Sequence, residues 1–271
     1  GRMKIFNRLL TALAMVALLA LPSKAYVVDG LLDDWGILPH SNWVPSSLSA
    51  DWNEENYMGG PRNTVPANNF LGHVFDVEAA YFDDSQNYIH FAIVTNFPET
   101  PPAVIGRDGQ PYLAGDVGIT LGGPVVPGDG YWAYEFGVVA TGADKGDVVA
   151  NPTWSLPAEY FTDYATYGQA GPSTITGGAV IGGAQIAWGD TGVTSYGETS
   201  KVLEGSILKS LLGIPAGAAS LGQEVTIHWT MTCGNDEAIV TGDIDNPVPE
   251  PATMALLGLG LTGVIVRRRK K

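Results

Sequence analysis

A repeated alternation of apolar and polar residues is the feature that most restricts the fold of this chain. Between residues 75 and 81 apolar side chains recur at every second position, and the same period returns over residues 88–97 and 224–232. A period of two places successive side chains on opposite faces of a β-strand, so each segment predicts a half-buried strand. Residues 83–87 form a polar turn between the first two segments, which predicts a hairpin.

Shorter segments predict the remaining strands, at residues 116–121, 131–141, 179–188 and 201–207. The connections are supplied by abundant turn formers, since the chain has 35 Gly and 18 Pro. Residues 206–212 predict one short helix that ends at Gly213 and Pro215. Roughly six or seven short strands with almost no helix predict an all-β fold, an antiparallel β-sandwich of jelly-roll type.

The first 25 residues have the pattern of a secretory signal peptide. Lys4 and Arg8 give a basic start, residues 9–21 are apolar, and Ser23 and Ala25 place small residues three positions and one position before a cut. The apolar stretch is too short to favour a membrane span. We therefore expect a signal-peptide helix at residues 1–25, passage through the Sec translocon, and a folded domain over residues 26–245.

Residues 246–271 combine three zones in a fixed order. The first contains Pro249, Glu250 and Pro251, and the second, residues 252–266, is apolar and uncharged. As a helix the second zone would be about 22 Å long against about 30 Å of hydrocarbon, so it predicts a short transmembrane helix. The third zone is basic and is predicted to stay on the cytoplasmic side of the membrane; its residues are Arg267, Arg268, Arg269, Lys270 and Lys271. An ordinary tail anchor is the alternative.

The order of these zones resembles the PEP-CTERM sorting signal. The resemblance implies recognition by an exosortase, transient contact with the inner membrane through the C-terminal helix, and removal of the tail. It also implies export to the cell surface or extracellular matrix of a Gram-negative bacterium. The segment HWTMTCGND, residues 228–236, resembles a recurrent ending of exported proteins of this group.

The domain between the two ends carries a second resemblance. The segments VDGLLDDW, EAAYFDDSQNYIHFAIV, GDVGITL, YWAYEFGVV and VLEGSILKSLLG follow one another in that order. Together they resemble the family nine carbohydrate-binding modules and related DOMON-like sandwiches. Glu204 and Ile207 fit the pattern, whereas Leu208 stands where the family has proline. The resemblance implies a β-sandwich, but the paired tryptophans of a sugar clamp have no assigned counterpart.

The charge of the domain narrows the classes of ligand. Residues 26–245 contain five Lys and Arg against 27 Asp and Glu, a formal charge of −22. Nucleic acid is therefore excluded as a partner, because phosphate binding needs clustered cations. Carboxylates are also calcium ligands, and a structural calcium ion is expected if the two ends of the domain meet; the candidate ligands are Asp29, Asp33, Asp34, Asp236, Asp243 and Asp245. The alternative for each is a turn cap or a solvated surface charge.

Aromatic residues in irregular segments are the candidates for binding sugar rings. Residues 36–69 are rich in Pro, Asn, Ser and Gly, and a loop of that length is usually functional or disordered. Exposed rings can stack on sugars, whereas buried rings would close the edge of the core. The candidates are Trp43, Trp52, Tyr57 and Trp154.

Catalytic motifs are not found in the sequence. It has no G-x-S-x-G, H-E-x-x-H or C-x-x-C pattern, and its G-x-G-x-x-G, which begins at Gly258, lies in the apolar C-terminal zone rather than after a strand. Cys233 is the single cysteine and is expected to be a buried apolar residue.

We therefore expect a non-enzymatic exported surface or extracellular-matrix protein that is associated with extracellular polysaccharide. Three alternatives stay open. The first is a carbohydrate-binding module, and the second is a hydrolase or lyase that acts on polysaccharide, which would need a cleft with two facing carboxylates. The third is a self-assembling filament subunit, in which residues 26–28 pair with the open edge of a neighbour.

Overall fold

The computed structural model describes residues 26–37, 43–45, 50–54, 73–122, 134–155, 171–195, 198–215, 217–234 and 236–245. The signal-peptide helix and the sorting helix predicted for the two ends lie outside these residues. Within the described ranges no helix has the length and apolar character that a membrane span requires.

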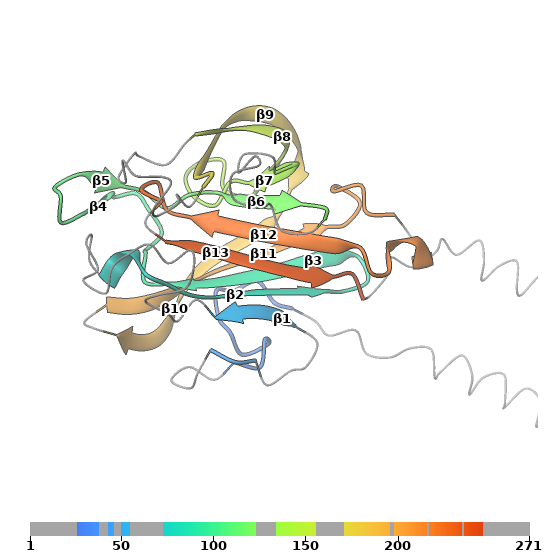
Figure 1. Ribbon diagram of the computed structural model, residues 1–271, viewed down its shortest axis with the longest axis horizontal. Helices are drawn as coiled ribbons and strands as arrows, with labels where there is room; N and C mark the ends of the chain where they lie inside the picture. Colours follow the sequence, from blue (N-terminus) through green and yellow to red (C-terminus); the bar gives the residue numbers. More distant parts are fainter. Residues whose placement is uncertain are drawn as a thin grey trace, which may run out of the picture.

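The described chain is all-β, with two large antiparallel sheets that lie one over the other (Figure 1). The five-stranded sheet has the order β1 (Asp51–Glu54), β2 (Val77–Asp84), β3 (Tyr88–Thr95), β11 (Glu198–Leu208) and β10 (Gln185–Ser195). The six-stranded sheet has the order β13 (Glu237–Asp243), β12 (Glu224–Thr230), β6 (Val117–Thr120), β7 (Phe136–Val138), β8 (Asp147–Ser155) and β9 (Thr174–Gly183). The smaller elements are the hairpin of β4 (Val104–Ile105) and β5 (Pro111–Tyr112) and the 3-10 turns η1 (His73–Phe75) and η2 (Gly217–Ser220).

The main core lies between the two sheets, because each sheet turns its apolar side chains inward. In β12 the residues Val225, Ile227 and Trp229 belong to this core, and in β3 so do Ile89, Phe91 and Ile93. The period-two pattern of both strands thus marks the inward face, as the sequence predicts. The result is a β-sandwich-like arrangement, while its assignment as a jelly roll stays a prediction.

A second apolar cluster covers the outer face of the five-stranded sheet. Leu32, Trp35 and Ile37 from the N-terminal segment pack against sheet residues that point away from the main core; those sheet residues are Ala79, Tyr81, Ala92, Val94 and Val202. All eight residues of β2 are therefore buried. The prediction of a half-buried strand is wrong here, because the N-terminal segment replaces water on the second face.

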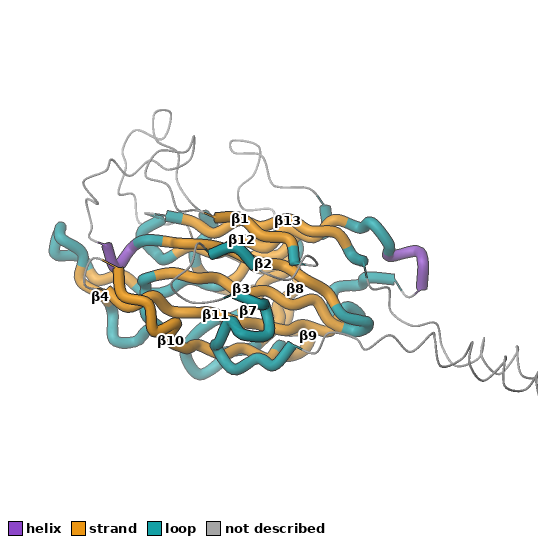
Figure 2. The backbone as a smooth tube through the Cα atoms, turned by 90° about the horizontal axis from the view of Figure 1, so that it is seen from below, coloured by secondary structure: helices purple, strands orange, loops and turns teal. Residues whose placement is uncertain are grey.

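The two sides of the sandwich are closed differently. On one side the chain passes from β9 directly into β10 at Ala184, so one nearly continuous stretch contributes to both sheets. On the other side β1 and β13 lie next to each other, and Asn53 Nδ2 donates to Ile239 O over 3.1 Å. Figure 2 shows these two pairs of strands at opposite margins of the molecule.

Most of the predicted strands are confirmed, with two corrections. Residues 179–188 were predicted as one strand, but they belong to β9 and β10, which lie in different sheets. Residues 206–212 were predicted as a short helix, but residues 206–208 end β11 and a turn follows, in which Leu212 N donates to Lys209 O. The pairing of β11 with β3 extends to Leu208 opposite Tyr88, and this ladder is incompatible with a helix.

Candidate functional site

A shallow pocket at one end of the six-stranded sheet is the candidate binding site. It encloses about 390 Å³ and is lined by Gln110, Pro111, Tyr112, Ser155, Ser173, Thr174 and Thr232. None of these seven residues is charged, although the domain as a whole is strongly acidic. Six of the seven side chains carry a hydroxyl or amide group beside apolar surface, and these groups can donate or accept hydrogen bonds with a neutral polar ligand.

Backbone geometry brings the distant parts of this pocket together. A Cβ atom at Gly115 would lie 2.0 Å from Thr230 O and 2.4 Å from Ser173 O, so only glycine permits this approach of the chains. Asp116 then accepts hydrogen bonds from Ala140 N at 2.9 Å and Ile175 N at 2.8 Å. Desolvation raises the pKa of the Asp116 carboxyl, and these two hydrogen bonds oppose that shift.

The hydroxyl groups of the pocket form their own network. Ser155 Oγ bonds Ser173 Oγ at 3.1 Å and also contacts Thr174 Oγ1, while Thr232 Oγ1 accepts from Leu113 N at 2.9 Å. Sequence reasoning missed this site. Its residues come from four separate parts of the chain, and isolated Ser and Thr residues carry no local signal that they will meet.

Buried Glu204 fixes the N-terminal segment on the five-stranded sheet. Its Oε2 accepts from Asp29 N and Gly30 N, each at 3.0 Å, and its Oε1 accepts from Trp35 Nε1 at 2.9 Å. Desolvation raises the pKa of Glu204 to about 7, although the three hydrogen bonds act in the opposite direction. These contacts give Glu204 a structural role.

Asp76 and Glu78 are the two neighbouring carboxylates with raised pKa values. Burial and the charge of Glu78 raise the pKa of Asp76 to about 7. The pKa of Glu78 is raised by desolvation, and Glu78 accepts from Trp43 Nε1 at 3.2 Å and Asn96 Nδ2 at 3.3 Å. Neither residue lines the pocket described above. Among the described residues, no two facing carboxylates of the kind a polysaccharide hydrolase needs line this pocket.

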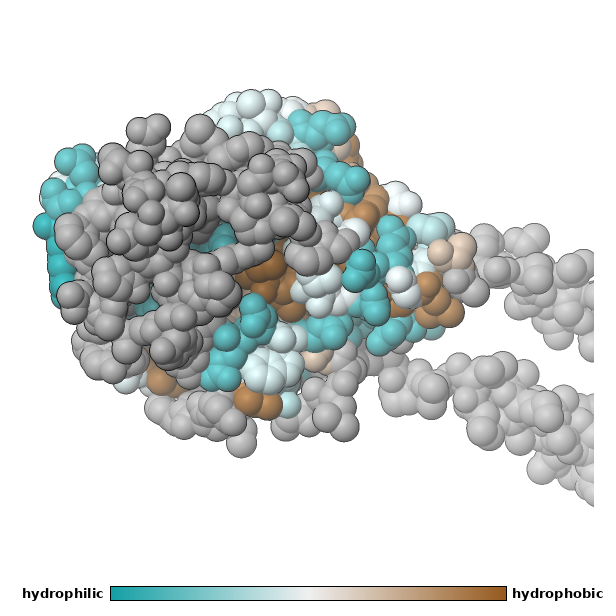
Figure 3. All heavy atoms as spheres, in the orientation of Figure 1, coloured by the Kyte–Doolittle hydropathy of each residue, from teal (hydrophilic) through white to brown (hydrophobic). Residues whose placement is uncertain are grey.

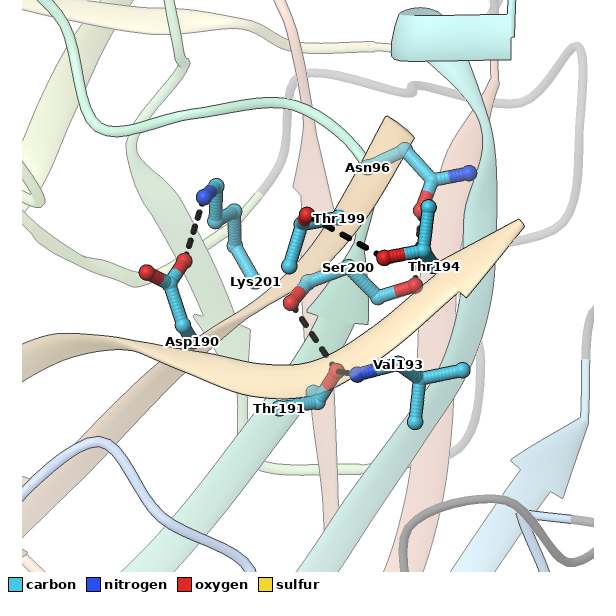
Figure 4. A network of polar contacts seen from close by, with 8 residues as sticks. All are labelled: Asn96, Asp190, Thr191, Val193, Thr194, Thr199, Ser200 and Lys201. Carbon is cyan, nitrogen blue, oxygen red and sulfur yellow. Dashed lines mark hydrogen bonds and ion pairs between the residues drawn. The ribbon is translucent and has the colours of Figure 1, made fainter. Parts of the chain in front are cut away.

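A polar network continues from Asn96 across the ends of β10 and β11. Ser200 Oγ donates to Asn96 Oδ1 at 2.8 Å, and Thr191 Oγ1 donates to Ser200 O at 3.0 Å (Figure 4). The ladder between β10 and β11 shifts register between Asp190 and Thr194. The hydroxyl groups thus bond to each other and to the backbone where the strand ladder is irregular, which indicates a structural role for them.

The six aspartates predicted as calcium ligands do not come together as one metal-binding group among the described residues. Asp236 precedes β13 and accepts from Val77 N at 2.8 Å, whereas Asp243 ends the same strand. Asp245 N donates to Asp84 Oδ1, and Asp34 Oδ2 accepts from Val27 N at 2.7 Å. Asp29 Oδ1 caps its own turn by accepting a hydrogen bond from Leu31 N. Asp33 lies in the same N-terminal segment, directly before Asp34 in the sequence. In the described ranges no group of three or more His, Cys, Asp or Glu is arranged to hold a metal ion.

The four aromatic candidates for sugar stacking have different environments. Trp43 is 6% exposed and belongs to the second apolar cluster, so it is not a free stacking surface. Trp52 in β1 is 39% exposed, and Trp154 is half-buried with its ring edge toward Tyr134. Tyr57 lies outside the described residues. Trp52 is thus the described candidate that offers the most open ring.

The remaining expectations concern Cys233 and the N-terminal residues 26–28. Cys233 is buried in the main core, as expected. Tyr26 donates a hydrogen bond from its hydroxyl to Asp83 and packs on the rings of Trp35 and His90, with centroids 4.5 Å away in each case. Tyr26 is thus held against its own domain in this structure, and pairing of residues 26–28 with a neighbour stays a prediction.

Comparison with known proteins identifies the function of the C-terminal segment. Residues 247–270 match the PEP-CTERM protein-sorting motif. The motif implies an exported protein that carries a membrane-anchored sorting signal and is processed by an exosortase. No curated protein and no solved structure matches the chain. These comparisons therefore give no support for the resemblance of the domain to carbohydrate-binding modules, which stays a prediction.

Proposed function

We propose that this protein is a non-enzymatic component of the bacterial surface or extracellular matrix that is associated with neutral extracellular polysaccharide. The observation that carries the proposal is the sorting motif at residues 247–270. The described fold reaches almost to this motif, since Ile244 N donates to Gln223 O and Asp245 N donates to Asp84 Oδ1. A folded β domain followed directly by a sorting signal is the arrangement expected of exported cargo.

The charge distribution supports a neutral rather than an acidic polysaccharide. The formal charge of −22 on residues 26–245 would repel a polymer of acidic sugars. The uncharged pocket offers hydroxyl and amide groups that match the hydrogen-bonding groups of a neutral sugar.

Removal of residues 247–271 tests the sorting role. In a Gram-negative host that contains an exosortase, the full chain should be shortened and should accumulate at the surface or in the matrix. The truncated chain should accumulate elsewhere. A second variant, P249A/E250A, keeps the length and the apolar zone and should also escape processing. A full chain that is not shortened, or one and the same location for the full chain and both variants, would refute the proposal.

Carbohydrate binding at the pocket is the second candidate function. Gln110 lines the pocket and is exposed, so the substitution Q110A should weaken retention of the protein in gels that contain a neutral polysaccharide. Q185A is the matched control, because Gln185 is exposed on β10 and does not line the pocket.

W52A tests the alternative surface at the exposed ring of Trp52. If W52A and not Q110A abolishes retention, the ligand binds at β1 instead.

A further inference from the structure

The strand β9 forms an open edge of the six-stranded sheet. In the strand order it is the last member, paired with β8 alone. Seven of its ten residues are exposed, among them the six consecutive residues 176–181, and Val180 is 61% exposed. An edge strand presents backbone N–H and C=O groups that can pair with another strand.

Natural proteins usually protect such an edge with charged residues or proline, but β9 contains neither. No Asp, Glu, Lys, Arg or Pro occurs between residues 173 and 189. The strand does use β-bulges, since its pairing with β8 shifts register at three places, and Figure 1 shows β8 and β9 as an arch. Bulges bend an edge without removing its hydrogen-bonding capacity.

The other edges of the two large sheets are contacted by neighbouring parts of the chain. β1 and β13 lie against each other, as the Asn53 to Ile239 hydrogen bond shows. β10 is crossed by the N-terminal segment, where a Cβ atom at Gly189 would lie 2.2 Å from Gly30 O. β9 is therefore the edge that the described structure leaves most open.

We propose that β9 pairs antiparallel with β9 of a second copy of this chain, so that the six-stranded sheet continues across a two-fold axis. Charge favours this occupant. Each domain carries a formal charge of −22, and two β9 strands place no carboxylate opposite another, so this contact avoids the local repulsion of a surface that bears carboxylates. A contact of a strand with its own copy is also self-complementary, as two-fold symmetry requires.

The surface supports pairing through backbone hydrogen bonds rather than through a broad apolar interface. On the face seen in Figure 3 the apolar residues of the described surface form separate patches among polar ones. Val180 and Ile181 supply exposed apolar side chains on β9 itself. This combination is typical of strand addition, in which main-chain hydrogen bonds provide affinity and a few side chains provide specificity.

A charge placed on β9 tests the proposal. The full chain, kept soluble by a mild nonionic detergent, should form dimers in sedimentation equilibrium. V180K should weaken dimerisation by about tenfold or more, because each copy would place a charged side chain in a strand pair that is otherwise uncharged. L221K is the matched control, since Leu221 is an exposed apolar residue (51%) outside β9, and it should leave the dissociation constant unchanged. A monomeric wild type, or equal dissociation constants for V180K and L221K, would overturn the proposal.

Charge complementation makes the test specific for a contact between two β9 strands. V180D alone should dissociate like V180K, whereas an equal mixture of V180K and V180D should associate more tightly than either variant alone. The apolar ends of the chain are identical in all samples, so they cannot produce this difference. If the mixture associates no better than the separate variants, the two β9 strands do not face each other and the proposal fails.

Discussion

The outer face of the five-stranded sheet and the outer edge of the six-stranded sheet are both potential binding surfaces, but only the face is covered. The N-terminal segment covers the face with Leu32, Trp35 and Ile37 and is held there by Glu204. Along β9, six consecutive residues are exposed.

The covered face contributes to the stability of the fold, whereas the open edge is available for recognition. A buried carboxylate that accepts three hydrogen bonds from one segment makes that segment part of the fold, because the donors would otherwise be buried without partners. An exposed strand contributes little to the core, and its sequence can change without loss of the fold. Substitutions on the covered face should therefore change stability, and substitutions on the open edge should change association.

The largest effect is expected for E204A. It removes the acceptor of three hydrogen bonds and leaves Gly30 N and Trp35 Nε1 buried without their partner. We expect the free energy of unfolding at pH 6 to fall by about 3–5 kcal/mol. Denaturant titration followed by tryptophan fluorescence measures this. E198A, at the half-buried start of the same strand and outside these contacts, is the control; an equal loss in both variants would contradict the role of Glu204.

Stability should also decrease as the pH rises from about 5 to 8. The pKa of Glu204 is raised from 4.5 to about 7 in the folded state, so the unfolded chain releases this proton at lower pH than the folded chain does. Deprotonation of Glu204 therefore lowers the free energy of unfolding, by about 3 kcal/mol once the pH is above 7. Asp76, whose pKa is also raised to about 7, adds to the effect in the same direction.

Unfolding free energies measured across this pH range provide the test. E204Q cannot titrate, so its stability should depend less on pH than that of the wild type. A wild type that becomes more stable between pH 5 and pH 8 would contradict the predicted sign.

A smaller effect is expected for Y26F. The substitution removes the hydroxyl that donates to the buried carboxyl of Asp83 while the ring keeps its packing on Trp35. We expect a loss of about 1–2 kcal/mol in the free energy of unfolding. Y88F, at the other tyrosine that packs on His90, is the comparison. Thermal unfolding of both variants provides the measurement. A larger loss in Y26F than in Y88F indicates the specific contact with Asp83, whereas equal losses indicate a general effect of removing a tyrosine hydroxyl.

The smallest effect on stability is expected for V180K. Val180 is exposed on β9, so its free energy of unfolding should change by less than about 0.5 kcal/mol. Circular dichroism and denaturant titration check that the fold is retained. A loss comparable to that of E204A would show that β9 is part of the cooperative core, and the contrast between the covered face and the open edge would fail.

Much of the fold could be predicted from local patterns. The period of two located β2, β3 and β12, and it identified Val225, Ile227, Trp229 and Met231 as one inward face, while shorter segments located β6 and β11. β8 and β13 were missed, since Gly, Pro and polar residues interrupt or shorten their apolar pattern. The predicted helix at residues 206–212 failed because strand pairing with β3 outweighs the local helical preference.

The candidate site could be predicted far less well. The sequence shows that aspartates and aromatic residues are present, but it does not show whether they are buried or which of them meet. Trp43 is in the core, and Asp236 and Asp243 lie at opposite ends of one strand. The pocket is made of Ser, Thr and Gln residues that are unremarkable in the sequence and become neighbours only through the approach at Gly115.

The sequence by itself determined that the chain is β-rich and strongly acidic and that residues 247–270 carry a sorting motif, because composition, period and motif are local properties. The tertiary structure decided that the N-terminal segment covers one sheet, that Glu204 is its anchor, and that β9 is an open edge. These features depend on contacts between residues far apart in the chain, such as Asp29 with Glu204. Burial, pKa shifts and free edges arise only when such contacts form.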